Sequence, residues 1–296
     1  MNWEGVMPAI TTPFTADGGI DHEFVRTHVR WLADHGSTAI IPCGSLGEGA
    51  TLDAAEKVAL MHTCVTALEN HVPVAPGIAA ASTKTAVWLC QKAAEAGCSG
   101  LMILPPYLHK GEWYEIGPHF EAMLDATDLS CMLYNNPAAY GTDVLPEQIA
   151  ELSRQHANLV AVKESSGDVR RITAIRALCG DRLTVAVGLD DVIVEGIAMG
   201  ARGWVAGLVN AFPAESVRLF ELARDDRHDD AFILYRWFLP LLRMDTVPEF
   251  VQLIKLVQAE VGMGSERVRA PRRPVSGAAR EAALATIQAA LENRPT

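Results

Sequence analysis

Short apolar runs alternate with longer amphipathic stretches along most of this chain, and this alternation restricts the fold more than any other feature. The runs have the length of strands and are almost uniformly apolar, as expected of parallel strands buried on both faces. They cover residues 6–10, 38–42, 72–78, 100–104, 130–134, 159–163, 183–188 and 203–207. Helix-like segments lie between them, among them residues 22–35, 53–69, 82–96 and 111–126. Eight such units in roughly 225 residues predict an α/β fold, the (β/α)8 TIM barrel.

Local signals mark several helix boundaries. Asp53, with Glu56 three residues later, is an acidic variant of the capping box, and Pro146 suits a first helical turn. Four glycines can adopt the left-handed conformation that ends a helix, namely Gly36, Gly97, Gly180 and Gly200. A doubly wound sheet is the rival architecture. It is disfavoured because Thr11-Thr12-Pro13-Phe14, and not a glycine-rich dinucleotide turn, follows the first run.

The last quarter of the chain is purely helical in pattern. Helices are predicted over residues 229–243, 248–260 and 277–291. We therefore predict a barrel over residues 1–224 and a C-terminal helical extension over residues 225–296. The basic loop at residues 267–273 is interpreted as a solvated connection or a subunit contact and not as a binding site.

Composition excludes several classes of protein. The chain has 296 residues and a formal net charge of −11, which argues against a nucleic-acid partner. The six cysteines form no C-x-x-C pair and the nine histidines form no H-x-H or H-x-x-x-H pair, so neither a disulfide framework nor a metal site is expected. No apolar run approaches the ~20 residues of a membrane span, and there is no basic N-terminal leader. These features predict a soluble, cytoplasmic protein with no membrane partner.

Lys163 ends the apolar run of residues 159–163. Taken alone, this pentapeptide is more typical of a lysine on a solvated strand end. If the ammonium group is buried, its pKa falls from about 10.4 by up to roughly 3–5 units. A neutral lysine amine attacks carbonyl and imine carbons and forms a Schiff base.

The residues at the ends of the other strands favour a catalytic role for Lys163 over a solvated position. In a barrel of this type the active residues lie at the carboxyl ends of the strands. The loop at residues 44–49 offers backbone N–H groups to an anion, although a simple tight turn has the same composition. It lacks the lysine and hydroxyl residue of a P-loop, so nucleotide binding is not expected. Tyr134 is either a core residue or, on the strand beside Lys163, a phenol that transfers protons.

Together these positions resemble, end to end, the dihydrodipicolinate synthase and N-acetylneuraminate lyase group of class I aldolase-like enzymes. The matching stretches are Gly44-Ser45-Leu46-Gly47-Glu48, Tyr134-Asn135-x-Pro137, Val162-Lys163-Glu164-Ser165-Ser166-Gly167-Asp168 and residues 203–210. The resemblance implies that Lys163 forms a Schiff base with a small 2-oxo or 2-imino acid, without a metal or diffusible cofactor. It also implies a homo-oligomer, a dimer of dimers.

The same resemblance assigns the remaining site residues. Tyr134 would be the general acid and base, and Ser45 would link it to a relay that includes Tyr107, which could come from a neighbouring subunit. The backbone of Ser45 and Leu46 would hold the substrate carboxylate. The substrate pocket would also contain Tyr140, Gly188, Asp190 and Val205, with Asp190 meeting a substrate hydroxyl.

Departures from the family pattern reduce the range of possible substrates. Ala139 stands where dihydrodipicolinate synthases carry an arginine for a semialdehyde carboxylate, and Leu46 stands where they carry a threonine. An alanine cannot replace a bidentate guanidinium group. The apolar residues around Asp190 (Leu189, Trp204, Val205 and Ala206) do not suit the polyol tail of a sialic acid.

The pattern of residues 44–51 with residues 134–141 resembles 1-pyrroline-4-hydroxy-2-carboxylate deaminases of bacterial hydroxyproline breakdown. Such an enzyme releases ammonia and 2-oxoglutarate semialdehyde. Three alternatives remain open: an aldolase or dehydratase of a 2-oxo-3-deoxy sugar acid, a dihydrodipicolinate synthase, and a non-catalytic barrel that only binds 2-oxo acids.

Overall fold

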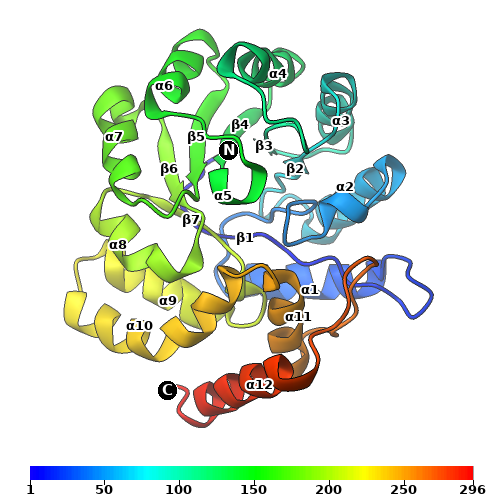
Figure 1. The fold of residues 1–296 in the computed structure, drawn as a ribbon, viewed down its shortest axis with the longest axis vertical. Helices are drawn as coiled ribbons and strands as arrows, with labels where there is room; N and C mark the ends of the chain where they lie inside the picture. The colour runs from blue at the N-terminus through cyan, green and yellow to red at the C-terminus, as the bar shows by residue number, and fades with distance from the viewer. Residues whose placement is uncertain (296) are drawn as a thin grey trace.

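A parallel, curled sheet of seven strands forms the centre of the molecule, and helices surround it (Figure 1). The structure, a computed structural model, describes residues 1–295. The strands pair in the order β1-β7-β6-β5-β4-β3-β2. They are β1 (Gly5–Pro8), β2 (Gly77–Ile78), β3 (Gly100–Ile103), β4 (Ser130–Asn135), β5 (Leu159–Glu164), β6 (Thr184–Val187) and β7 (Gly203–Ala206). The predicted α/β barrel is confirmed.

The predicted strand at residues 38–42 closes the barrel between β1 and β2, but only through isolated bridges. Ile41 pairs with Ala9 on one side, and Ile40 pairs with Val74 on the other. Prolines at positions 8, 42, 73 and 76 interrupt this part of the sheet. Because proline has no backbone N–H to donate, a continuous ladder cannot form here. A backbone hydrogen bond still joins this segment to β1, because Ile41 N donates to Pro8 O at 2.8 Å.

The helices of the barrel begin and end close to the predicted positions. They are α1 (His22–Asp34), α2 (Ala54–Leu68), α3 (Thr83–Glu95), α4 (Trp113–Asp125), α5 (Pro137–Tyr140), α6 (Pro146–Gln155), α7 (Arg170–Cys179), α8 (Ile193–Ala198) and α9 (Pro213–Arg224). The capping box of Asp53 and Glu56 is present at the start of α2, and Pro146 occupies the first turn of α6. Gly36 has a φ of 91° at the end of α1, the left-handed conformation that its sequence position predicted.

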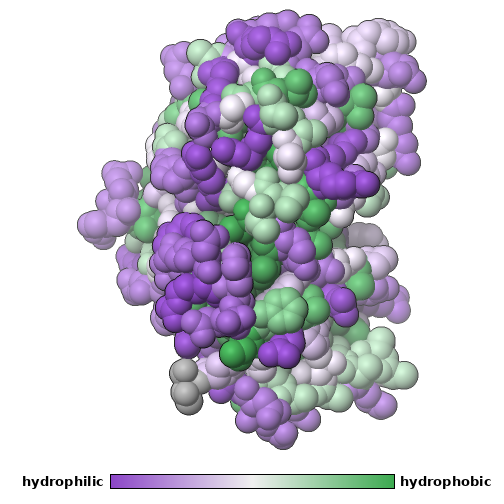
Figure 2. All heavy atoms as spheres, turned by 90° about the vertical axis from the view of Figure 1, so that its left-hand side faces the viewer, coloured by the Kyte–Doolittle hydropathy of each residue, from purple (hydrophilic) through white to green (hydrophobic). Residues whose placement is uncertain are grey.

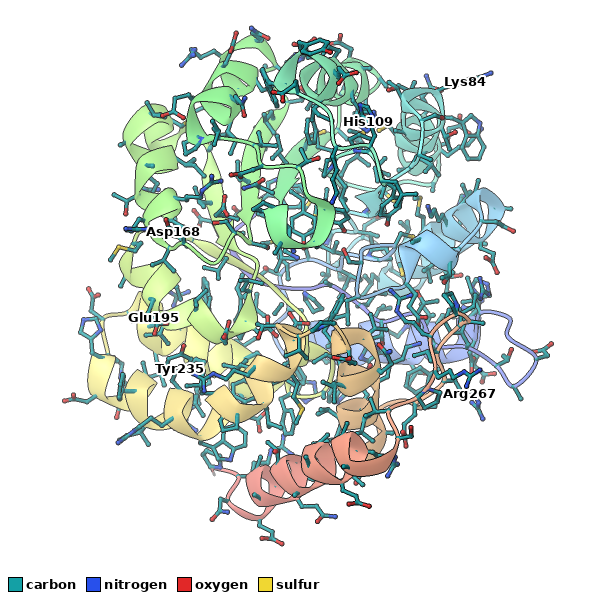
Figure 3. All side chains as sticks on the ribbon, in the orientation of Figure 1. Lys84, His109, Asp168, Glu195, Tyr235 and Arg267 are labelled. Atoms are coloured by element: carbon teal, nitrogen blue, oxygen red, sulfur yellow. The ribbon has the colours of Figure 1, made fainter. Side chains whose placement is uncertain are left out.

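Three further helices follow the barrel, α10 (His228–Leu242), α11 (Phe250–Glu260) and α12 (Gly277–Glu292). In Figure 1, α10 lies beside α9, and α12 lies outermost, against α10 and α11. The division at residue 224 stays a prediction, and residue 296, the last of the predicted extension, lies outside the described residues. Figure 3 shows Arg267 on the long segment between α11 and α12, which returns toward the N-terminal half of the barrel.

A large cluster of buried apolar side chains forms the interior of the molecule. On the face shown in Figure 2, polar side chains cover most of the surface and hydrophobic groups are visible between them. All six cysteine thiols are free, and five of them are buried. None of the helices in residues 1–295 has the length and apolar character of a membrane span.

Candidate active site

Lys163 lies near the end of β5 and is only 6% exposed, so a solvated strand end is the wrong interpretation. Its backbone partner on the neighbouring strand β4 is Tyr134, because the two residues are in register. The Lys163 Nζ lies 4.3 Å from the centre of the Tyr134 ring. A buried amine thus faces a phenol, the pair that Schiff-base chemistry requires.

Gly188, just after β6, leaves room for the lysine side chain. A Cβ atom at this position would lie 2.6 Å from Cε of Lys163 and would also collide with Oγ of Ser165. No side chain larger than glycine fits there without moving the lysine. The Ser165 hydroxyl is buried and has no hydrogen-bond partner among the described residues. It is therefore available to a bound substrate.

Three tyrosines form a cluster beside the lysine. Helix α5 presents Tyr140, because Asn136 caps its first turn and Gly141, with a φ of 70°, ends it. The Tyr140 ring lies edge-on to that of Tyr134, with centres 5.7 Å apart, and 6.0 Å from that of Tyr107. The Tyr107 ring of the same chain is therefore already at the site.

The hydrogen bonds of this cluster differ from the expected relay. The hydroxyl groups of Ser45 and Tyr140 share a hydrogen bond, whereas the Tyr134 hydroxyl accepts one from Asn136 Nδ2 at 3.0 Å. Within residues 1–295 no hydrogen bond joins Ser45 directly to Tyr134, because Tyr140 takes that place. Burial raises the pKa of Tyr107 to about 12 and that of Tyr140 well above its ordinary value. Burial therefore opposes ionisation of both phenols.

The glycine-rich loop after residue 42 is tightly folded. Cys43 and Glu48 have φ values of 63° and 54°, a left-handed conformation that residues other than glycine rarely adopt. A Cβ on Gly47 would lie 2.8 Å from the carbonyl oxygen of Ile10. Among the described residues, the backbone N–H groups of Ser45 and Leu46 donate to no protein acceptor. Two unpaired donors at this position suit a carboxylate.

The C-terminal extension holds this loop in place through Glu48, which is fully buried. One carboxylate oxygen accepts from Lys255 Nζ at 2.6 Å, and the other accepts from the backbone N–H of Arg269 at 3.0 Å. The Arg269 side chain reaches Glu56 at the start of α2 at 2.7 Å. The basic loop is therefore docked on the barrel and is not merely solvated.

A cavity of about 580 Å³ opens above Lys163. It is the right size for a small acid. Most of the predicted site residues line it, namely Ser45, Leu46, Tyr107, Tyr134, Tyr140, Lys163, Gly188 and Val205. The structure thus brings together residues that lie up to 160 positions apart in the chain.

Asp190 is the exception, and the expectation that it meets a substrate hydroxyl is wrong for this geometry. Its side chain is 0% exposed and does not line the cavity. Its carboxylate already accepts from Trp204 Nε1 at 2.9 Å and from the backbone N–H groups of Gly207 at 3.1 Å and Leu208 at 2.7 Å. Asp190 therefore fixes the end of β7 and has no oxygen directed at a substrate.

Two charged residues of the C-terminal extension line the cavity without having been predicted, Asp245 and Arg272. Arg272 lies 3.8 Å from Glu48, close to the glycine-rich loop, which corrects the interpretation of its loop as no part of a binding site. Asp245 lies over Gly207, where an added Cβ would collide with its carboxyl group. Burial, together with the nearby Asp190 carboxylate, raises the pKa of Asp245 well above its ordinary value.

No group of three or more histidine, cysteine or acidic side chains within residues 1–295 is arranged to hold a metal ion. The cavity lining offers an amine, several phenols, a carboxyl group and a guanidinium group.

Comparison with known proteins agrees with this geometry. The family model described as "Dihydrodipicolinate synthetase family" matches residues 2–290. The chain belongs to this family. A 4-hydroxy-tetrahydrodipicolinate synthase from Geobacter metallireducens is 33% identical over 285 residues, which cover 96% of this chain and 97% of the relative.

Solved structures of the family superpose over nearly the whole chain. A dihydrodipicolinate synthase from Bacillus anthracis has a TM-score of 0.93 and 28% identity, with complete coverage of both chains. A family protein from a prophage of Escherichia coli K12, in complex with pyruvate, has a TM-score of 0.92 and 26% identity and covers 98% of this chain and 99% of its own. Family enzymes are Schiff-base-forming, class I aldolase-like lyases that use a lysine and no external cofactor. This chain is an enzyme of that kind.

Proposed function

We propose that the protein converts 1-pyrroline-4-hydroxy-2-carboxylate into 2-oxoglutarate semialdehyde and ammonia, as in hydroxyproline catabolism. The observation that carries this proposal is the uncharged wall of the cavity at Ala138 and Ala139. Synthases of the family use an arginine there to hold a second carboxylate. The only cation besides Lys163 among the described lining residues is Arg272, which lies on the side of the glycine-rich loop. A substrate with a single carboxylate fits this distribution of charge.

The first two steps of the reaction each have a residue that can perform them. The Lys163 amine attacks C2 of the cyclic imine, and expulsion of the ring nitrogen opens the ring to a protonated Schiff base. Tyr134, or a water held by it, removes a proton from C3 and leaves an enamine. The enamine expels the C4 hydroxyl as water. Tautomerisation then gives an imine at C5, and hydrolysis at C2 and C5 frees Lys163 and ammonia. Overall, one water is consumed for each ammonia released.

The substrate is held at its carboxylate in this proposal. The unpaired N–H groups of Ser45 and Leu46 bind the carboxylate, and Arg272 adds a positive charge on the same side. These local donors offset the net charge of −11, which would otherwise repel an anion.

A second candidate is 4-hydroxy-tetrahydrodipicolinate synthase, because curated relatives that are 30–33% identical carry that name. It would join pyruvate, bound to Lys163, to a semialdehyde that carries its own carboxylate. Ala139 offers this second carboxylate no charged partner.

The two candidates are separated by parallel assays of the purified protein. One incubation contains 1-pyrroline-4-hydroxy-2-carboxylate and is scored for ammonia and 2-oxoglutarate semialdehyde. A second contains pyruvate and the amino-acid semialdehyde, and a third contains a 2-oxo-3-deoxy sugar acid and is scored for pyruvate. We expect turnover in the first only. Condensation in the second, with no ammonia in the first, would identify a synthase, and turnover only in the third would identify a sugar-acid enzyme.

An Ala139→Arg variant is the matched control. It restores the cation that the cavity wall lacks. We expect it to lower ammonia release and to raise any residual condensation with the semialdehyde. The opposite pattern would contradict the interpretation of this wall.

A further inference from the structure

We propose that Asp245 is the general acid that protonates the departing C4 hydroxyl group of the substrate. This inference rests on the proposed function, because only a substrate with a hydroxyl two carbons from the Schiff base carbon requires such an acid. It assigns a catalytic role to a residue of the C-terminal extension.

The position of Asp245 in the fold supports this role. It ends the 3-10 helix Arg243–Asp245, which follows α10, and lies above Gly207 at the end of β7. In the sheet, β5 with Lys163 has β4 with Tyr134 on one side and β6, then β7, on the other. Tyr134 and Asp245 therefore stand on opposite sides of the reactive amine, and both line the cavity.

A substrate bonded to Lys163 would lie between these two groups. Removal of the C3 proton and departure of the C4 hydroxyl are separate events on adjacent carbons, so they need two proton-transferring groups. Tyr134 is adjacent to the lysine, where C3 lies after the Schiff base forms at C2. Asp245 is on the far side of the amine, where it would meet C4 of a substrate chain that extends away from Tyr134.

The carboxyl group of Asp245 has no competing partner. No hydrogen bond or ion pair from residues 1–295 reaches it, although protein atoms surround it and it keeps some exposure to the cavity. An unpartnered carboxyl group at the wall of a cavity is free to form a hydrogen bond with a bound hydroxyl group. The Ser165 hydroxyl, also unpartnered and in the lining of the same cavity, offers a further hydrogen-bonding group to a bound substrate.

The surroundings of the two carboxyl groups favour protonation of Asp245 over that of its neighbour Asp190. Asp190 has three donors that stabilise its ionised form, and its pKa is raised by burial only to about 6. Asp245 has no such donor, and its burial and then the Asp190 carboxylate oppose its ionisation, whereas Lys163 favours it. Ionisation is thus favoured at Asp190 and opposed at Asp245, so a proton is held preferentially by the member that faces the cavity.

The step balances without another reactant. The enamine electron pair moves toward C4 as the C4–O bond breaks, and the Asp245 proton passes to the departing oxygen, which leaves as water. The product is a conjugated iminium ion on Lys163 and an Asp245 carboxylate. The carboxylate regains a proton from water in the cavity before the next turnover.

The test compares wild-type protein with Asp245→Asn and, as a matched control, Asp191→Asn. The control removes a nearby carboxylate that does not line the cavity. We expect Asp245→Asn to release ammonia from 1-pyrroline-4-hydroxy-2-carboxylate at least ~100-fold more slowly, because general acid catalysis contributes about 10²–10⁴-fold. Asp191→Asn should remain within about tenfold of wild type. Borohydride trapping with pyruvate, which has no hydroxyl to expel, should label Lys163 equally in all three proteins.

A pH profile gives an independent readout. The active form of Asp245 is protonated, so the wild-type kcat should fall as pH rises through its raised pKa, and this limb should be absent from Asp245→Asn. Ammonia release by Asp245→Asn close to the wild-type rate would overturn the role of Asp245 but not the proposed function. Loss of the pyruvate adduct in this variant would also overturn it, since Asp245 would then act on Schiff base formation. A wild-type protein that forms the pyruvate adduct but releases no ammonia would refute the proposed function, and this inference with it.

Discussion

Tyr134 and Lys163 show how far a single pair of residues determines the chemistry of this cavity. Sequence placed them at the ends of two apolar runs, and the structure puts them in register on β4 and β5. The lysine amine lies over the phenol ring at 4.3 Å, and the Tyr134 hydroxyl is held by Asn136. The phenol is thus oriented by a side chain two residues away and is free to exchange a proton with an adduct.

Tyr134→Phe should keep the fold and lose catalysis. The ring still packs against Tyr140, but no group remains to remove the C3 proton, so kcat should fall by about 10²–10⁴-fold. Steady-state ammonia release measures this, and pyruvate trapping at Lys163 reports whether the site is intact. Activity within tenfold of wild type would show that another group removes the proton.

Arg272 is a second single residue whose role can be tested, because its effect on substrate binding should be separable from its effect on catalysis. If its positive charge helps to hold the substrate carboxylate, Arg272→Gln should raise KM by roughly tenfold, the factor that corresponds to about 1.4 kcal/mol, with little change in kcat. Arg267→Gln, on the same loop but not in the cavity lining, is the matched control. A lower kcat with an unchanged KM would contradict a role in binding.

At the scale of elements, the glycine-rich loop and the C-terminal extension act as one unit. The loop contains two residues in the left-handed conformation, and Glu48 anchors it to Lys255 on α11. The Lys255 Nζ also donates to the backbone carbonyls of Thr12 at 2.8 Å and Arg267 at 2.6 Å. One buried ammonium group therefore connects the first loop of the barrel, the glycine-rich loop and the segment that carries Arg272.

Lys255→Met should destabilise the protein strongly. It leaves the Glu48 carboxylate buried without its charge partner, and breaking such a pair costs about 3–5 kcal/mol. Urea unfolding measures the change, with Lys92→Met as control, because Lys92 pairs with Glu95 on the surface and should cost at most about 1 kcal/mol. Equal unfolding free energies for the two variants would show that the buried pair contributes nothing beyond packing.

Element boundaries were predictable wherever local chemistry sets them. The capping box at Asp53, the proline at 146 and the glycine at 36 act within one turn, so the sequence contains the whole signal. The segment at residues 38–42 was predicted as a strand but pairs only through bridges, because the prolines that interrupt it belong partly to its neighbours. Its pairing depends on contacts between distant segments and not on its own composition.

At the scale of the whole molecule, the barrel was predictable and the completed cavity was not. Eight repeated units indicated a barrel, and the barrel places strand ends together, so residues at those ends were found. Asp190 was assigned wrongly because a strand-end position does not reveal that a carboxylate is already satisfied by Trp204 and two backbone donors. Asp245 and Arg272 were missed because they reach the cavity from a 3-10 helix and a loop outside the barrel repeat, and no local pattern connects them to it.

The central claim is that the buried amine of Lys163 bonds covalently to a 2-oxo or 2-imino acid. Reduction with borohydride in the presence of pyruvate, followed by peptide mass mapping, tests it most directly. Of the six lysines in the chain, only Lys163 should carry the reduced adduct. An unlabelled Lys163, or labelling that persists in Lys163→Ala, would contradict the account.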